Sequence, residues 1–167
     1  WDLAVDPTNR AFASSSSDGK SILFSYPAGE VIGLAVALDD MIGGVAFSPD
    51  GKILFGGGAD GRVRLWDVTQ GVLKANTPIG HNGAITDLEL SGARNLLVTL
   101  GADQLIRFWR LESKVPLADE YQVAGRAAKG LAFSPDGQLL AAGDDAGNIE
   151  LWRLGEGQPP VVLSGHR

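Results

Sequence analysis

The sequence predicts an all-β chain built from four copies of one unit, each unit containing four short antiparallel strands. Two separate sets of residues recur along the chain with a common spacing, and residues typical of turns divide it about every 8–12 residues. No segment keeps a helical period for ten residues. The repeat is therefore interpreted before any single motif, because a missed repeat leads to the wrong fold.

The first recurring feature is a five-residue turn sequence. Phe47–Gly51 reads Phe-Ser-Pro-Asp-Gly and returns unchanged at Phe133–Gly137, which is 86 residues or two periods of 43 later. The related segment Leu90–Arg94 begins 43 residues after Phe47, and Val5–Asn9 begins 42 residues before it.

The second recurring feature is aromatic. Trp66, Trp109 and Trp152 follow one another at intervals of 43 residues, and Phe24 precedes Trp66 by 42. Each of the four follows an apolar or aromatic residue. Because the two features share one period and one phase, they indicate four repeats that cover the whole chain.

The third repeat shows the internal pattern best. Its four expected strands are Ile85–Leu90, Asn95–Leu100, Leu105–Leu111 and Val115–Val123. Asp-Gly pairs, which favour tight turns, stand between the first and second strands of two repeats and between the second and third strands of two repeats. These pairs are Asp50-Gly51, Asp136-Gly137, Asp18-Gly19 and Asp60-Gly61.

A unit of this length with a tryptophan late in it resembles the WD-repeat β-propeller family. The marker dipeptide is complete as Trp66-Asp67 and is altered in the other repeats to Phe24-Ser25, Trp109-Arg110 and Trp152-Arg153. The Gly-His pair typical of the family stands at Gly80-His81 and Gly165-His166. The resemblance implies four propeller blades, numbered 1 to 4, at residues 1–40, 41–83, 84–126 and 127–167, within a ring of seven or eight.

His81, Thr99 and Asp103 combine an imidazole, a hydroxyl and a carboxylate, as in a hydrolase triad. The family resemblance implies a different role, a structural tetrad with Trp109 in which buried polar groups satisfy one another. Thr99 and Asp103 stand 10 and 6 residues before Trp109, as that tetrad requires, and only blade 3 has the complete set. We therefore expect a structural tetrad and no catalytic residue.

Composition narrows the classes of partner and site. The formal charge of −6 and the pI of about 4.8 disfavour nucleic acid. There is no cysteine, and no apolar run is long enough for a membrane helix. Asp2, Asp87 and Glu89 are too few for a metal site in the channel, so we expect neither metal nor cofactor. A cytoplasmic location is the default expectation.

The family resemblance implies a non-catalytic scaffold for protein–protein interaction. Such propellers bind proteins or peptides on one end of the ring, here called the top face, which carries the connection into each blade and the turn between its second and third strands. Aligned position selects four large or cationic side chains there: Trp1, Met41, Arg126 and Arg167. The alternative is a propeller enzyme, or a binder of a metal or small ligand in the central channel.

Four blades are too few for the ring that the resemblance implies. The first and last blades would each expose an apolar sheet face, which is costly in water. Two solutions remain open: a homodimer that closes an eight-bladed ring head to tail, or further blades in a longer chain. The chain begins with Trp1 rather than methionine, so we expect an excerpt of a longer protein, a processed chain or a trimmed one.

Overall fold

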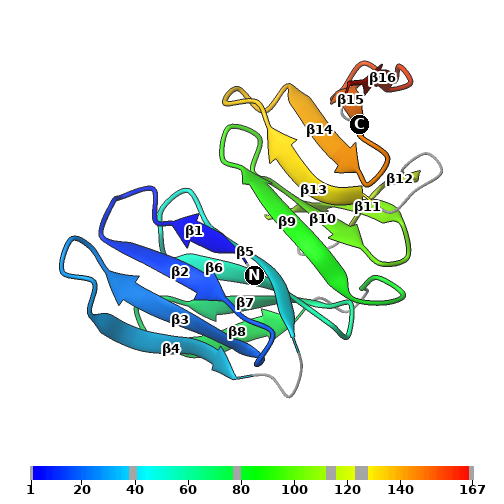
Figure 1. The fold of residues 1–167 in the computed structure, drawn as a ribbon. Coiled ribbons are helices and arrows are strands. Elements are labelled where there is room, and N and C mark those ends of the chain that lie inside the picture. Colours follow the sequence, from blue (N-terminus) through cyan, green and yellow to red (C-terminus); the bar gives the residue numbers. More distant parts are fainter. Residues whose placement is uncertain (1, 38–40, 77–79, 112–115, 123–127, 166–167) are drawn as a thin grey trace.

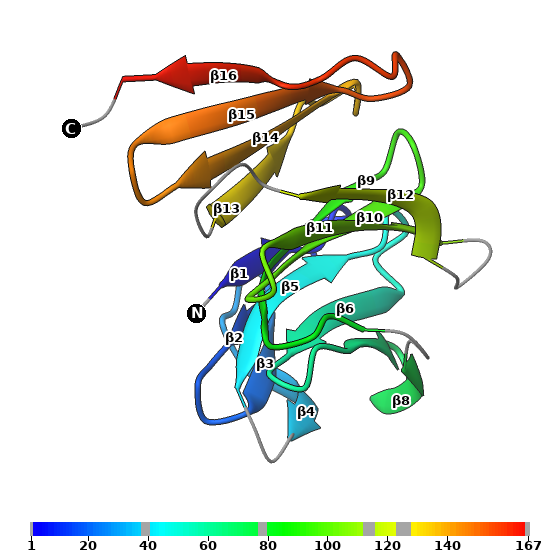
Figure 2. The same ribbon diagram turned by 90° about the vertical axis from the view of Figure 1, so that its right-hand side faces the viewer.

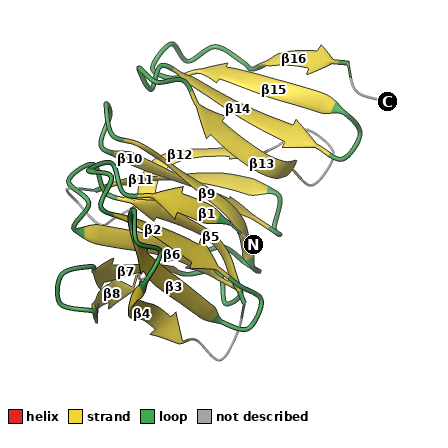
Figure 3. Cartoon of the chain, turned by 60° about the vertical axis from the view of Figure 1, so that its left-hand side comes forward, coloured by secondary structure: helices red, strands yellow, loops and turns green. Residues whose placement is uncertain are grey.

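Each of the four repeats folds into one antiparallel sheet of four strands joined in chain order. The computed structural model describes residues 2–37, 41–76, 80–111, 116–122 and 128–165. Within these ranges the secondary structure consists of strands joined by turns and loops, without a helix (Figure 3). The predicted all-β fold is therefore confirmed.

The four sheets are built from consecutive strands of the chain. Blade 1 contains β1 (Leu3–Val5), β2 (Ala11–Ser15), β3 (Lys20–Ser25) and β4 (Val31–Ala37). Blade 2 contains β5 (Ile42–Phe47), β6 (Ile53–Gly58), β7 (Val63–Asp67) and β8 (Val72–Asn76). Blade 3 contains β9 (Ile85–Ser91), β10 (Leu96–Gly101), β11 (Leu105–Arg110) and β12 (Pro116–Gln122). Blade 4 contains β13 (Ala128–Phe133), β14 (Leu139–Asp144), β15 (Asn148–Arg153) and β16 (Val161–Ser164).

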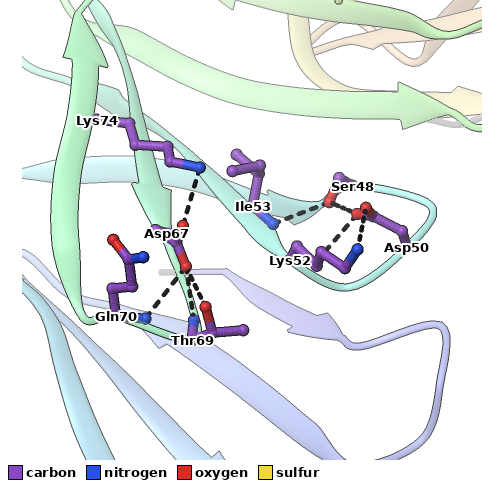
Figure 4. A network of polar contacts seen from close by, with 8 residues as sticks. All are labelled: Ser48, Asp50, Lys52, Ile53, Asp67, Thr69, Gln70 and Lys74. Atoms are coloured by element: carbon purple, nitrogen blue, oxygen red, sulfur yellow. Dashed lines mark hydrogen bonds and ion pairs between the residues drawn. The ribbon is translucent and has the colours of Figure 1, made fainter.

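The recurring Ser-Pro-Asp-Gly sequence closes the turn between the first two strands of a blade. In blade 2 the Ser48 hydroxyl donates to the Asp50 carboxylate at 2.6 Å and accepts the Ile53 N–H at 2.9 Å (Figure 4). Gly51 follows with a φ of +69°, a conformation that side chains resist. Blade 4 repeats the same contacts, so the motif recurs because one turn geometry recurs.

The aspartate of the Trp66-Asp67 dipeptide holds the turn between β7 and β8. Its carboxylate accepts the N–H and hydroxyl of Thr69 at 2.9 and 2.6 Å and the N–H of Gln70 at 3.1 Å (Figure 4). Lys74 lies 2.9 Å away, and its hydrogen bond, followed by that of Thr69, holds the pKa of Asp67 well below its usual range. This role is local to one turn, so other blades tolerate other residues there.

The sheets are arranged in chain order with their innermost strands side by side (Figures 1 and 2). Each blade has a near face, toward the preceding blade, and a far face, toward the following one. The tryptophan of each blade lies on its near face: Trp66 packs between blades 1 and 2, Trp109 between blades 2 and 3, and Trp152 between blades 3 and 4. The 43-residue aromatic period therefore marks one large side chain for each contact between blades.

Two of these contacts also use an aspartate, which lies just before β1 in blade 1 and within β9 in blade 3. One Asp2 carboxylate oxygen accepts the Leu3 N–H at 2.8 Å, and the other accepts the Val45 N–H of blade 2 at 3.0 Å. Asp87 repeats this arrangement with the Leu88 N–H at 2.8 Å and the Leu131 N–H of blade 4 at 2.6 Å. We call this contact the aspartate joint.

The contact between blades 2 and 3 is made differently. Gly44 occupies the position of Asp2 and Asp87 in the repeat, and here backbone meets backbone. A Cβ atom on Gly44 would lie 2.9 Å from the Leu88 nitrogen and 3.3 Å from the Asp87 Cα, so any side chain would push the strands apart. We call this contact the glycine joint.

Among the residues that the structure describes, no blade covers the near face of blade 1. Leu3 and Val5 are 71% and 66% exposed, whereas their counterparts in blade 2, Val45 and Phe47, are 3% and 5% exposed. Phe12 and Phe24 lie on the same face of blade 1 and stack with a centroid distance of 4.8 Å.

Replacing Asp87 by alanine is expected to lower the free energy of unfolding by about 1–3 kcal/mol, because two backbone N–H groups lose their acceptor in a half-buried joint. Asp87→Asn keeps one acceptor oxygen and is expected to recover part of the loss. Urea denaturation measures both, with exposed Asp145→Ala as the control. Equal stability of Asp87→Ala and the control would contradict a stabilising role for the aspartate joint.

Candidate functional site

The structure brings the four predicted tetrad residues together in blade 3. The Trp109 indole N–H donates to Thr99 Oγ1 at 2.9 Å, and Thr99 Oγ1 lies 2.7 Å from His81 Nε2. His81 Nδ1 lies 2.8 Å from the Asp103 carboxylate. Since an ionised carboxylate only accepts, this pattern assigns the imidazole proton to Nδ1, and the Thr99 hydroxyl donates to Nε2.

The order hydroxyl, imidazole, carboxylate matches a hydrolase triad, but Thr99 has no exposed surface. Its oxygen already accepts the indole N–H of Trp109, and its proton is directed to His81. A nucleophile must reach a substrate atom, and this hydroxyl is fully buried on β10, the strand paired with β9 and β11. The geometry suits a buried structural network.

Asp103 connects the network to two loops at the top face. It accepts the Asn82 backbone N–H at 2.9 Å and the Leu105 N–H at 3.2 Å, which join the connection before β9 to the turn after β10. Burial raises the pKa of Asp103, but the bonds from Asn82 and His81 together outweigh it, and the pKa lies below its usual range. The carboxylate is thus held ionised beside the imidazole.

The other blades use different groups at the corresponding positions. Blade 2 has Gly56 in place of the threonine, and its Asp60 forms a two-pronged ion pair with Arg64 at 2.9 and 2.7 Å. The corresponding pair in blade 3, Asp103 and Arg107, has a longer separation of 3.7 Å. Blade 4 has Ala142 at the threonine position, and blade 1 has Ser14. The sequence did not predict the Asp60–Arg64 pair, although their four-residue separation is compatible with contact across the turn.

A cavity of about 390 Å³ lies along the innermost strands of blades 1 to 3. Its wall combines apolar side chains such as Leu3 and Val5 with two carboxylates, Asp2 and Glu89. Burial, and then repulsion from Asp87 and Asp2, raises the pKa of Glu89 to about 7. Glu89 is therefore the more perturbed of the two acids that line this cavity, a property that the sequence alone did not indicate.

Of the four residues predicted to bind a partner, the structure describes one. Met41 lies just before β5, is 36% exposed, and its carbonyl accepts the Ala59 N–H from the neighbouring turn at 3.0 Å. Trp1, Arg126 and Arg167 lie outside the described residues. Among the side chains that are described, no three His, Cys, Asp or Glu residues are grouped as a metal site would require. No helix in the described ranges is long and apolar enough to cross a membrane.

Replacing Thr99 by valine is expected to lower the free energy of unfolding by about 2–4 kcal/mol. The shape is preserved, but His81 Nε2 and the Trp109 N–H both lose a buried partner. The matched control is Ser14→Ala, at the same position of blade 1, which is expected to cost less than about 0.5 kcal/mol. Comparable losses in calorimetric unfolding of the two variants would argue against a stabilising network in blade 3.

The raised pKa of Glu89 gives a pH-dependent contribution to stability. The folded state binds this proton more tightly than the unfolded state, so the contribution is complete below about pH 4.5 and is lost as pH rises through about 7. Glu89→Gln is expected to remove this dependence and to stabilise the fold by about 1–2 kcal/mol at pH 8, since partial exposure reduces the full linkage value. Urea denaturation at pH 5 and pH 8 tests it, with exposed Glu156→Gln as control. A variant that keeps the wild-type pH slope would refute this role.

Several known proteins resemble this chain at about the same level of sequence identity. The periodic tryptophan protein 2 homolog of Dictyostelium discoideum is 32% identical over 74% of this chain and 14% of its own length. Autophagy-related protein 16 of Arabidopsis thaliana is 31% identical over 71% of this chain and 24% of its own. Small ribosomal subunit protein RACK1y of rice, Oryza sativa subsp. japonica, is 32% identical over 68% of this chain and 34% of its own. The chain thus spans about a third or less of these relatives.

The family model described as WD domain, G-beta repeat matches three segments, residues 38–67, 73–110 and 125–153. These segments fall on blades 2, 3 and 4 and each includes the tryptophan of its blade. Blade 1, with Phe24 in place of tryptophan, has the same four-stranded sheet. With the repeat period, the four sheets and the family match in agreement, the chain belongs to the WD40 family, the WD domain with G-beta repeats.

Proposed function

We propose that this chain is a non-catalytic scaffold that holds other proteins or peptides. The observation that carries the proposal is the state of Thr99, His81 and Asp103, which resemble a catalytic set but are bonded to one another, with Thr99 and His81 buried and Asp103 partly buried. Their contacts stabilise the blade and present no group to a substrate. A rigid platform with exposed connecting loops is suited to binding a partner.

The top face is the proposed binding surface. Met41 is a large, partly exposed side chain beside the channel, and thioethers adapt to varied partner shapes. Aligned position puts Arg126 and Arg167 in corresponding connections and Trp1 at the start of an innermost strand, and tryptophan and arginine are enriched among residues that dominate binding energy. The name of the rice relative assigns that protein to the small ribosomal subunit.

Selection from a displayed library of random peptides, with the wild-type chain immobilised, tests the surface. Affinities of the selected peptides are expected to fall about tenfold or more in Met41→Glu, because a charge replaces an apolar contact. The matched control Val162→Arg also puts a charge on an exposed apolar position, but on the outer strand β16. Peptides that bind Met41→Glu and wild type equally would reject the top face as the site.

The alternative function is a small-ligand or metal binder, or an enzyme, that uses the channel. The cavity beside Glu89 is the observation that favours it. Metal analysis of the purified protein and a hydrolase screen would distinguish the two. Turnover that depends on His81, Thr99 and Asp103 would overturn the scaffold.

The proposal also covers how the outer faces of blades 1 and 4 are buried and where in the cell the protein is found. The uncovered faces of blades 1 and 4 would be covered by a second copy, in an eight-bladed ring, or by further blades of a longer chain. The proposed compartment is the cytoplasm, which fits a chain without cysteine because no disulfide is needed. Cell fractionation tests this location.

A further inference from the structure

A crevice of about 200 Å³ lies between the outer strands of blades 1 and 2. Its floor is apolar, because Leu23 of blade 1 and Leu54 and Trp66 of blade 2 line it and are each at most 5% exposed. Gly33 on β4 and the turn between β7 and β8 complete the lining. A blade that stacks on the near face of blade 1 or on the far face of blade 4 covers a different surface. The crevice therefore belongs to two blades of this chain, whatever else the ring contains.

Gly33 leaves the crevice open, and nothing in the described part of the chain requires a glycine there. Its φ lies outside the left-handed region, and a Cβ atom added to it would meet no atom within 4 Å. Other strand glycines have a close neighbour: a Cβ atom would lie 2.9 Å from the Leu88 nitrogen at Gly44 and 2.8 Å from the Trp66 ring at Gly56. A glycine inside a strand often marks the close approach of a ligand or of another backbone. Gly33 is therefore the residue that points to an occupant.

The polar side of the crevice needs no partner from outside. The Asp67 carboxylate already accepts hydrogen bonds from the turn that follows it and pairs with Lys74 (Figure 4). An apolar occupant thus leaves no acceptor of Asp67 unsatisfied. An apolar cavity of about 150 Å³ is large enough to bind benzene. The crevice therefore has room for one leucine, methionine or aromatic side chain.

The edge of the sheet beside the crevice is open to pairing. β4 is the outermost strand of blade 1 and, among the described residues, pairs only with β3 (Figure 1). Charges, proline or a short length usually discourage a further strand from adding to such an edge. β8 carries Lys74, β12 carries Pro116 and Glu120, and β16 has only four residues. β4 has seven residues, and none of them is charged or proline.

Acidic residues flank β4 at both ends. Glu30 directly precedes the strand and is exposed, and Asp39 and Asp40 follow it in the sequence. Lysine and arginine are absent from the whole stretch between Lys20 and Lys52. Exposed carboxylates beside an open edge favour a partner with positive charge. The occupant is therefore expected to be apolar along the strand and basic next to it.

We propose that β4 and the crevice bind an extended peptide segment of a partner protein. The segment adds to β4 as a fifth strand and places one large apolar side chain in the crevice. In a paired strand the residue opposite Gly33 points to the same face of the sheet as Gly33, and this face borders the crevice. A lysine or arginine beside that apolar residue lies near Glu30. The site is separate from the top face and does not rest on the proposed function.

Selection from a displayed library of random peptides on the immobilised wild-type chain tests this site. Gly33→Val is the sharpest variant, because its side chain enters the space that the peptide would fill. It is expected to weaken binding of the crevice peptides about tenfold or more, with a melting temperature equal to or above that of wild type, since the space is open and valine favours strands. Gly143→Val, also at a strand glycine with open space, is the matched control and is expected to keep the affinity.

The selected peptides also test the chemistry of the occupant. Peptides that depend on Gly33 are expected to share one large apolar residue next to lysine or arginine, and Glu30→Lys is expected to weaken them about threefold or more at low salt. N-methylation of the peptide amides that face β4 is expected to abolish binding, whereas methylation of the alternate amides is tolerated. Tolerance at every amide would overturn strand addition. A selection in which no peptide depends on Gly33 would overturn the site, and the top face would stand or fall separately with Met41→Glu.

Discussion

The two faces of a four-stranded sheet impose the main constraint on this chain, because a blade is stable in water only when both faces are covered. Apolar surface removed from water contributes roughly 25 cal/mol per Å², and the three buried clusters each combine the far face of one blade with the near face of the next. This explains which features recur most strictly. The aromatic residue of each near face and the length of the unit must match the neighbouring blade. The Asp of the marker dipeptide serves only its own turn, and only blade 2 has it.

The polar contacts within a blade can be made by different residues in different blades, because each group of contacts has to satisfy only its own buried donors and acceptors. Blade 3 uses the His81–Thr99–Asp103–Trp109 network, and blade 2 uses an Asp60–Arg64 pair at the corresponding turn. The contacts between innermost strands also vary from blade to blade. An aspartate bridges two strands, or a glycine lets their backbones meet, and both solutions hold adjacent blades together.

Much of the fold could be predicted from sequence because its determinants are periodic. The repeat, the Asp-Gly turns and most strand ends of the third repeat were predicted within about one residue, and the spacing of the tetrad residues matched their contacts. The aspartate joints could not be predicted, because their acceptors pair with backbone N–H groups, which nearly every residue has. Asp2 and Asp87 were considered only as candidates for a channel site. The pKa of Glu89 likewise depends on strands from different blades that converge.

The position of the tetrad connects stability with the proposed binding role. His81 lies in the connection before β9 and Asp103 in the turn after β10, so the network joins the two loops that blade 3 presents at the top face. Loops fixed before binding lose less conformational entropy when a partner arrives, and affinity gains by that difference. Blade 4, with alanine at the threonine and aspartate positions, lacks this network. The turn of blade 4 is instead held by Asp144, which accepts the N–H groups of Ala146 and Asn148 at 2.8 Å, so blades 3 and 4 fix their top-face turns with different residues.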